Sequence, residues 1–228
     1  MEASDRPTPL AVLFDIDGTL VDSNYLHVDA WSRAFAEAGT PVDTWRIHRA
    51  IGMDSGKLLD ELLGDAADSA GPVAKEAHAR LYAEMSERLR VFAGARELLQ
   101  ALSDRGHTIV LATSAPPEEL ELLLDVLDMG DTLDVVTSAQ DAETAKPDPD
   151  ILTVAVQRAG VSPDRAVMVG DAVWDVQAAA RAGVPCVGVL SGGTGRDELR
   201  AAGAVAVYDD VACLLRELDA SPLRATAE

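Results

Sequence analysis

The sequence predicts an α/β protein with a doubly wound, Rossmann-like parallel sheet and an inserted all-helical cap domain. Two observations predict the sheet: short apolar runs alternate with helical patterns over residues 92–218, and several of these runs end in polar segments. A third observation predicts the cap, because residues 22–90 contain helical patterns only. Strands that alternate with helices in this way are typical of a parallel sheet covered on both faces.

The expected strands are short, continuous apolar runs, which are typical of strands buried on both faces. They lie at residues 10–14, 108–112, 133–136, 165–169, 185–190 and 204–208. Helices are expected between them, at residues 95–103, 118–127, 149–159 and 173–182. The last of these helices stops at Gly183, a residue type that commonly follows a helix because it tolerates a left-handed backbone.

The cap is expected from helical patterns at residues 24–38, 43–50, 55–63 and 72–89. Glycine and proline interrupt the block at residues 39–41, at Gly52 and at Gly71-Pro72. We therefore expect residues 1–21 and 91–228 to form the core domain. Residues 22–90 should form a separate cap domain that packs over the edge of the sheet.

Composition argues against several classes of function. The 39 acidic and 19 basic side chains give a net charge of −20, which disfavours binding to nucleic acid and to anionic membranes. No apolar stretch approaches the ~18 residues needed to span a bilayer, and residues 1–9 are polar. Cys186 and Cys213 lie in apolar stretches and do not indicate a disulfide framework. We expect a cytoplasmic monomer or homodimer that acts on a small molecule.

Polar residues that follow the expected strands form the candidate site. Ligands of an open parallel sheet gather at the carboxyl ends of its strands. Carboxylates brought together there repel one another, and a hard divalent cation such as Mg²⁺ relieves that repulsion. The residues expected at this edge are Asp15, Asp17, Thr113, Ser114, Lys146, Asp171 and Asp175.

The spacing of Asp15 and Asp17 suits chemistry at one phosphorus atom. Residues i and i+2 of an extended segment point to the same side, so both carboxylates can reach one centre. One can attack as a nucleophile, and the other can supply and remove protons. Gly18 permits close backbone approach, and the neighbouring N–H groups can bind phosphate oxygens.

Four segments resemble the motifs of the haloacid dehalogenase superfamily, in the family's order. Residues 14–23 read FDIDGTLVDS and resemble the first motif. The second, third and fourth motifs are matched by residues 112–114 (ATS), 145–149 (AKPDP) and 169–175 (VGDAVWD). A helical cap inserted after the first motif resembles the phosphoglycolate phosphatase and β-phosphoglucomutase branch.

The resemblance implies a role for each matching residue. Asp15 would attack phosphorus and form a phosphoenzyme, while Asp17 would protonate the leaving oxygen and then activate water. Mg²⁺ would be held by the carboxylates of Asp15 and Asp171 and by the backbone carbonyl of Asp17.

Four further residues would support this chemistry. Thr113 would bind a phosphoryl oxygen, and Gly18 would supply backbone contacts. Lys146 would neutralise charge on the nucleophile and the phosphoryl group. Asp175 could orient Lys146 or a metal-bound water. Ser114 is the better candidate to cap the helix that follows, which leaves Thr113 free for phosphate.

Two cap residues carry open alternatives. His27 lies where β-phosphoglucomutases carry a functional histidine, or it is a polar residue near the hinge. Arg49 belongs to a basic cluster with Arg46, His48 and Lys57, which would bind a distal anion of the substrate or pair with nearby acids. The mutase pattern has an arginine soon after the glycine that corresponds to Gly52, and this chain lacks it.

The expected function is therefore Mg²⁺-dependent hydrolysis of a small phosphate monoester through an aspartyl-phosphate. A sugar-phosphate mutase and a non-catalytic binding protein of the same fold are the alternatives. Asp17 argues against a dehalogenase and against a phosphonatase, because both branches lack an acidic residue at that position.

Overall fold

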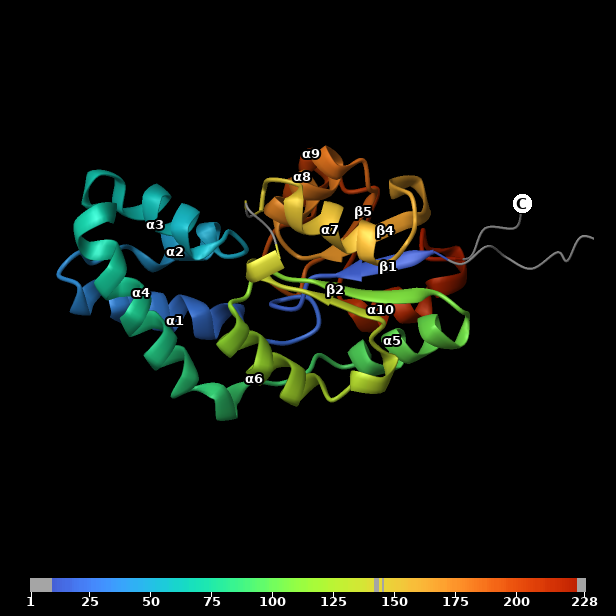
Figure 1. Cartoon of the computed structure of the whole chain (residues 1–228), viewed down its shortest axis with the longest axis horizontal. Coiled ribbons are helices and arrows are strands. Elements are labelled where there is room, and N and C mark those ends of the chain that lie inside the picture. Colours follow the sequence, from blue (N-terminus) through green and yellow to red (C-terminus); the bar gives the residue numbers. More distant parts are fainter. Residues whose placement is uncertain (1–9, 142–143, 145, 225–228) are drawn as a thin grey trace, which may run out of the picture.

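A computed structural model describes residues 10–141, 144 and 146–224 of the chain. Six parallel strands form one sheet in the order β3-β2-β1-β4-β5-β6 (Figure 1). This confirms the predicted fold class. The strands are β1 (Ala11–Phe14), β2 (Thr108–Ala112), β3 (Val135–Thr137), β4 (Ala166–Gly170), β5 (Cys186–Val189) and β6 (Ala206–Tyr208).

Helices cover both faces of the sheet. One face packs against α5 (Ala95–Asp104), α6 (Pro117–Leu127) and α10 (Val211–Arg216). The other packs against α7 (Asp150–Arg158), α8 (Val173–Ala182) and α9 (Arg196–Ala202). Short 3-10 helices occupy Gly64–Ala66, Ser86–Arg88, Gly130–Thr132, Ala139–Asp141, Pro163–Arg165 and Leu218–Ala220.

Strand β1 is buried on both faces of the sheet, which explains why its sequence is uniformly apolar. Val12 and Phe14 pack into the cluster on one face, while Ala11 and Leu13 pack into the cluster on the other. All four side chains are fully buried. A central strand of this kind needs apolar residues at every position rather than at alternate ones. The strand therefore fixes where Asp15, the next residue, emerges from the sheet.

The helical block at residues 22–90, which we continue to call the cap, contains four α-helices. They are α1 (Asn24–Glu37), α2 (Thr44–Ala50), α3 (Ser55–Leu63) and α4 (Ala67–Ala83). Helices α1 and α4 pack along each other, with Trp31, Phe35 and Leu81 buried. Figure 1 shows this block beyond the end of the sheet at which β1 ends.

The expected break at Gly71-Pro72 is wrong. Helix α4 begins at Ala67, runs through Pro72 and ends at Ala83, before the expected end at residue 89. Proline removes one backbone hydrogen bond and crowds the preceding turn. The buried face of α4, which includes Ala74 and Leu81, outweighs that local cost because it packs into the cap.

Within the described residues, no helix has the length and apolar character that crossing a bilayer requires. Both cysteines are free thiols: Cys186 is buried in β5, and Cys213 is partly exposed on α10.

Candidate active site

The topology brings the predicted polar residues to one rim of the sheet. Asp15 follows β1, Thr113 follows β2 and Asp171 follows β4, so three adjacent strands end at the site. The Asp15 N–H donates to the Val169 carbonyl at 3.0 Å, which ties the loop after β1 to β4. Lys146 reaches the same point from the loop that precedes α7.

Lys146 is a buried cation held between two carboxylates. Its Nζ lies 2.6 Å from Asp15 Oδ1 and 2.8 Å from Asp175 Oδ1, and the side chain is only 1% exposed. Burial alone would lower the pKa of Lys146, but Asp15 and Asp175 hold it above its ordinary value. The ammonium group is therefore a permanent positive charge beside Asp15.

The acidic residues at this rim could hold a divalent metal. Asp15, Asp171 and Asp175 each offer a carboxylate oxygen, and these atoms lie within 4.8 Å of one another. Burial raises the pKa of Asp15 to about 7, although Lys146 opposes the shift. Burial and the charges of Asp175 and Asp15 also raise the pKa of Asp171. Hard oxygen donors under mutual repulsion fit a hard dication.

Asp171 is held by two residues that the sequence analysis did not single out. Thr19 Oγ1 donates to Asp171 Oδ1 at 3.1 Å, and Asn24 Nδ2 donates to Asp171 Oδ2 at 2.9 Å. Gly192 leaves room for this carboxylate, because a Cβ at position 192 would lie 1.6 Å from Asp171 Oδ2. Thr19 lies within the first motif, which was an available signal; Asn24 carried none.

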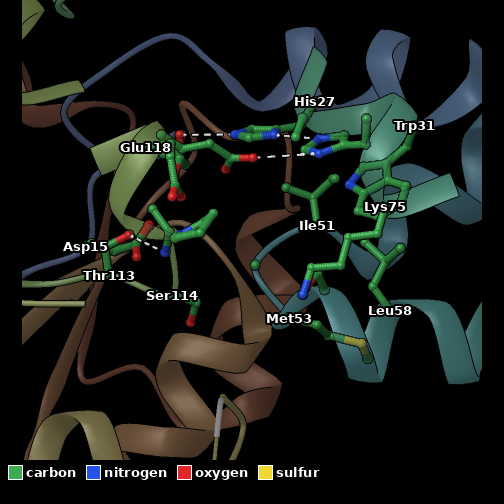
Figure 2. Close-up of a pocket in the computed structure, with 18 residues that line it drawn as sticks. Asp15, His27, Trp31, Ile51, Met53, Leu58, Lys75, Thr113, Ser114 and Glu118 are labelled. Atoms are coloured by element: carbon green, nitrogen blue, oxygen red, sulfur yellow. Dashed lines mark hydrogen bonds and ion pairs between the residues drawn. The ribbon is translucent and has the colours of Figure 1, made fainter. Parts of the chain in front are cut away.

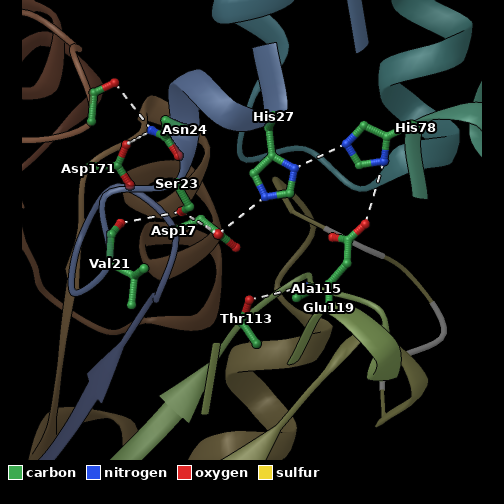
Figure 3. Close-up of polar contacts among 11 residues, drawn as sticks. Asp17, Val21, Ser23, Asn24, His27, His78, Thr113, Ala115, Glu119 and Asp171 are labelled. Atoms are coloured by element: carbon green, nitrogen blue, oxygen red, sulfur yellow. Dashed lines mark hydrogen bonds and ion pairs between the residues drawn. The ribbon is translucent and has the colours of Figure 1, made fainter. Parts of the chain in front are cut away.

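Asp17 contacts the cap through His27. Its Oδ1 accepts a hydrogen bond from Ser23 Oγ at 2.5 Å and lies 3.3 Å from His27 Nε2 (Figure 3). Burial acts to raise the pKa of Asp17, but the neighbouring His27 holds it below its ordinary value. Burial acts to lower the pKa of His27, and Asp17 holds it above its ordinary value. This contact places His27 against Asp17, and both alternatives for His27 stay predictions.

A cavity of about 200 Å³ lies between the core and the cap (Figure 2). The core contributes Asp15, Asp17 and the hydroxyl residues after β2. The cap contributes His27 and a largely apolar wall. That wall includes Trp31, Ile51, Met53 and Leu58, with Lys75 and His78 beside it. The volume is large enough for a small molecule beside Asp15.

The expectation that Ser114 caps helix α6 is wrong. Thr113 Oγ1 accepts the N–H of Ala115 at 3.1 Å, whereas Ser114 caps nothing. The Ser114 hydroxyl is buried without a hydrogen-bond partner among the described residues. Helix α6 begins at Pro117, where a proline needs no N–H partner, so a side-chain cap is unnecessary. Both hydroxyl residues line the cavity.

Arg49 lies outside the cavity. Its guanidinium pairs with Glu198 Oε1 at 2.6 Å, and about half of its side chain is exposed. His48 Nε2 lies 3.2 Å from the Gly192 carbonyl, and Lys57 pairs with Asp148 at 2.5 Å. These three cap residues contact the core, which favours the pairing alternative for the basic cluster.

A family model for haloacid dehalogenase-like hydrolases matches residues 9–183. The chain belongs to this family. A phosphoglycolate phosphatase from Rhodospirillum rubrum is 36% identical over 216 residues, which cover 90% of this chain and 89% of that one. A phosphorylated carbohydrates phosphatase from Thermotoga maritima is 31% identical and covers 91% of this chain and 99% of its own.

A solved structure supports the same assignment for this haloacid dehalogenase-like hydrolase. The crystal structure of a hydrolase from Pseudomonas syringae has a TM-score of 0.88 and 36% sequence identity, and covers 92% of this chain and 98% of its own. Together, the family match and the phosphatase relatives identify the chain as a phosphoric monoester hydrolase of the branch that resembles phosphoglycolate phosphatases and β-phosphoglucomutases.

Proposed function

We propose that this protein hydrolyses a small phosphate monoester in two displacements at Asp15, with Mg²⁺ as its cofactor. The contact that carries the proposal joins Lys146 Nζ to Asp15 Oδ1 at 2.6 Å; both residues are buried, and Asp15 lines the cavity. A permanent cation at this distance favours the ionised form of Asp15 against the effect of burial, and it lies beside the oxygen atoms that would attack phosphorus.

In the first displacement, a carboxylate oxygen of Asp15 attacks the phosphorus atom. The new O–P bond forms as the ester P–O bond breaks, and Asp17 gives a proton to the leaving oxygen. This step requires Asp17 to be protonated when substrate is bound, although His27 lowers its pKa in the free protein. Lys146 offsets the negative charge on Asp15 and on the transferring phosphoryl group. The products of this step are the free alcohol and phosphorylated Asp15.

In the second displacement, water attacks the phosphorylated Asp15. Asp17, now ionised, takes a proton from the water as the Asp15 O–P bond breaks. This step releases inorganic phosphate, restores the Asp15 carboxylate and returns Asp17 to its protonated form. Thr113 and Ser114, which line the cavity beside Asp15, supply hydroxyl groups to the phosphoryl oxygens.

Mg²⁺ would be held by the carboxylates of Asp15 and Asp171 and by the carbonyl of Asp17. When bound, it would supply positive charge to the phosphoryl oxygens. Thr19 and Asn24 hold Asp171 in position for this role. Asp175 serves Lys146 instead, because its Oδ1 faces that ammonium group and its Oδ2 accepts the Ala172 N–H at 3.1 Å.

The cavity supports a substrate of modest size. Its volume of about 200 Å³ and its partly apolar cap wall leave room for a small alcohol portion beside the phosphoryl group. The relatives are named for phosphoglycolate and for phosphorylated carbohydrates, both small phosphorylated metabolites. We propose the same substrate class here.

The test compares Asp15→Asn with Asp22→Asn, because Asp22 is an exposed aspartate on the same loop. A panel of phosphorylated metabolites is incubated with each protein and Mg²⁺, and both inorganic phosphate and isomerised ester are measured. We expect phosphate release by the wild type and by Asp22→Asn, and none by Asp15→Asn. Turnover by Asp15→Asn would refute the role of Asp15, and isomerisation faster than phosphate release would indicate a mutase.

A further inference from the structure

Four titratable side chains form a continuous chain from the site floor through the cap and back to the core (Figure 3). Asp17 Oδ1 lies 3.3 Å from His27 Nε2, and His27 Nδ1 lies 3.1 Å from His78 Nε2. His78 Nδ1 then lies 3.5 Å from Glu119 Oε1. The proposed function uses Asp17 but gives no role to His78 or Glu119.

The positions of the ring nitrogens of His27 and His78 limit which of them can donate a hydrogen bond. His78 is neutral, because burial and the nearby charge of His27 lower its pKa to about 2. A neutral imidazole has one N–H, and we assign it to Nδ1, which lies 3.5 Å from Glu119 Oε1. His78 Nε2 is then an acceptor for the Nδ1–H of His27. That assignment leaves the Nε2–H of His27 directed at Asp17.

Aromatic packing restricts rotation of both imidazole rings. The His27 ring stacks on Tyr82 with centroids 4.0 Å apart, and the His78 ring stacks on Trp31 with centroids 4.1 Å apart. Both histidines are less than 8% exposed. The rings therefore have little freedom to exchange partners, so His27 keeps Nε2 toward Asp17 and Nδ1 toward His78.

This series of four side chains crosses between core and cap twice. Asp17 and Glu119 belong to the core, whereas His27 and His78 lie on the cap helices α1 and α4. All three contacts therefore exist together only when the cap sits on the core as it does in this structure. The groups that face Glu119 are His27 and Asp17 through the chain, Glu118 on its own helix and Lys75 on α4.

We propose that His78 and Glu119 are positioning residues that act through His27 on Asp17, so that Asp17 is oriented for proton transfer when the cap is closed. This inference rests on the proposed function. A correctly oriented Asp17 matters most when the leaving oxygen is a poor leaving group that must be protonated. It matters little for an ester whose leaving group departs as a stable anion.

The test varies the leaving group. The variants are Glu119→Gln, which keeps the shape but removes the charge, and His78→Phe, which keeps a stacking ring but removes both nitrogens. Glu121→Gln is the matched control, because Glu121 is an exposed glutamate of the same helix. We measure kcat/KM with 2,4-dinitrophenyl phosphate and with the alkyl phosphate monoester that the wild type hydrolyses fastest.

We expect Glu119→Gln and His78→Phe to lower kcat/KM for the alkyl ester by about tenfold or more, and for the dinitrophenyl ester by less than about threefold. In the double variant Glu119→Gln/His78→Phe, the difference between the losses of kcat/KM on the two esters should be no larger than in either single variant. Both residues act through the same series of side-chain contacts. Equal losses on the two esters, or additive losses in the double variant, would overturn the proposal.

The same measurements distinguish a failure of the proposed function from a failure of the positioning role. If wild-type protein and Asp15→Asn hydrolyse both esters equally, the role of Asp15 is wrong whatever the Glu119 variants do. If Asp15 is required but Glu119→Gln matches Glu121→Gln on both esters, only the positioning role is wrong. Circular dichroism and thermal unfolding confirm that each variant is folded before its kinetics are compared.

Discussion

Lys146 Nζ lies 2.6 Å from Asp15 Oδ1, although the two residues are 131 positions apart in the chain. Asp175 balances the same ammonium group from α8 at 2.8 Å. A buried lysine is costly unless it is paired, so this cation and its two carboxylates stabilise one another. The three charged groups on which the proposed mechanism depends are therefore also part of the folded core.

Removing the lysine should destabilise the metal-free protein. Lys146→Met leaves Asp15 and Asp175 buried without their cation, which should cost about 3–5 kcal/mol of unfolding free energy. Urea denaturation in EDTA measures this loss. The double variant Lys146→Met/Asp175→Asn should lose less than the sum of the two single variants, by about 0.5–3 kcal/mol. Additive losses would show that the ion pair contributes no coupling energy.

Stabilisation by Mg²⁺ should depend on pH. Burial raises the folded-state pKa of Asp15 from 3.8 to about 7, so its ionisation costs stability as pH rises through 7. Mg²⁺ binds the ionised carboxylates in competition with protons. The rise in Tm on adding Mg²⁺ should therefore be larger at about pH 8 than at about pH 6. Equal rises would argue against Asp15 as a ligand.

The space beside Asp171 should be essential for the metal. In Gly192→Ala, the new methyl group would lie 1.6 Å from Asp171 Oδ2 and must displace that carboxylate. We expect the Mg²⁺ concentration for half-maximal activity to rise by about 10–100-fold. Gly130→Ala is the control, because its Cβ meets nothing within 4 Å. An unchanged Mg²⁺ requirement in Gly192→Ala would exclude Asp171 as a ligand.

Glu119 should make the folded protein less stable at neutral pH. Burial raises its pKa from 4.5 to about 6, so its favourable contribution is present below pH 4.5 and lost as pH rises through 6. Glu119→Gln removes this titration and should raise the unfolding free energy at neutral pH by up to about 2 kcal/mol. Chemical denaturation from pH 4 to 8 measures the difference. A pH dependence identical to that of the wild type would contradict it.

Local pattern was enough to predict the sheet and the convergence of its polar residues. The central strands β1, β2, β4 and β5 are short and largely buried, and the apolar run of β1 ends just before Asp15. The parallel order then brings distant loops to one rim. Local pattern failed at Pro72, where tertiary packing outweighs a helix-breaking signal.

Contacts between cap and core could not be predicted in the same way. Asn24 reaches Asp171 across 147 positions, and Glu119 reaches His78 from a different domain. Neither contact follows from periodicity or from a motif, because both depend on how the helical block sits on the sheet. The capping role expected for Ser114 is absent for a related reason, since α6 begins at Pro117 without a side-chain cap.

The phosphorylated state of Asp15 is the central claim, and trapping it tests that claim most directly. The protein is mixed with substrate and Mg²⁺, quenched in acid within the first turnover, reduced with borohydride and analysed by peptide mass spectrometry. The account predicts conversion of Asp15 to homoserine in the wild type and in Asp22→Asn, and no conversion without substrate. Reduction at a different aspartate, or rapid turnover with Asp15 never modified, would contradict it.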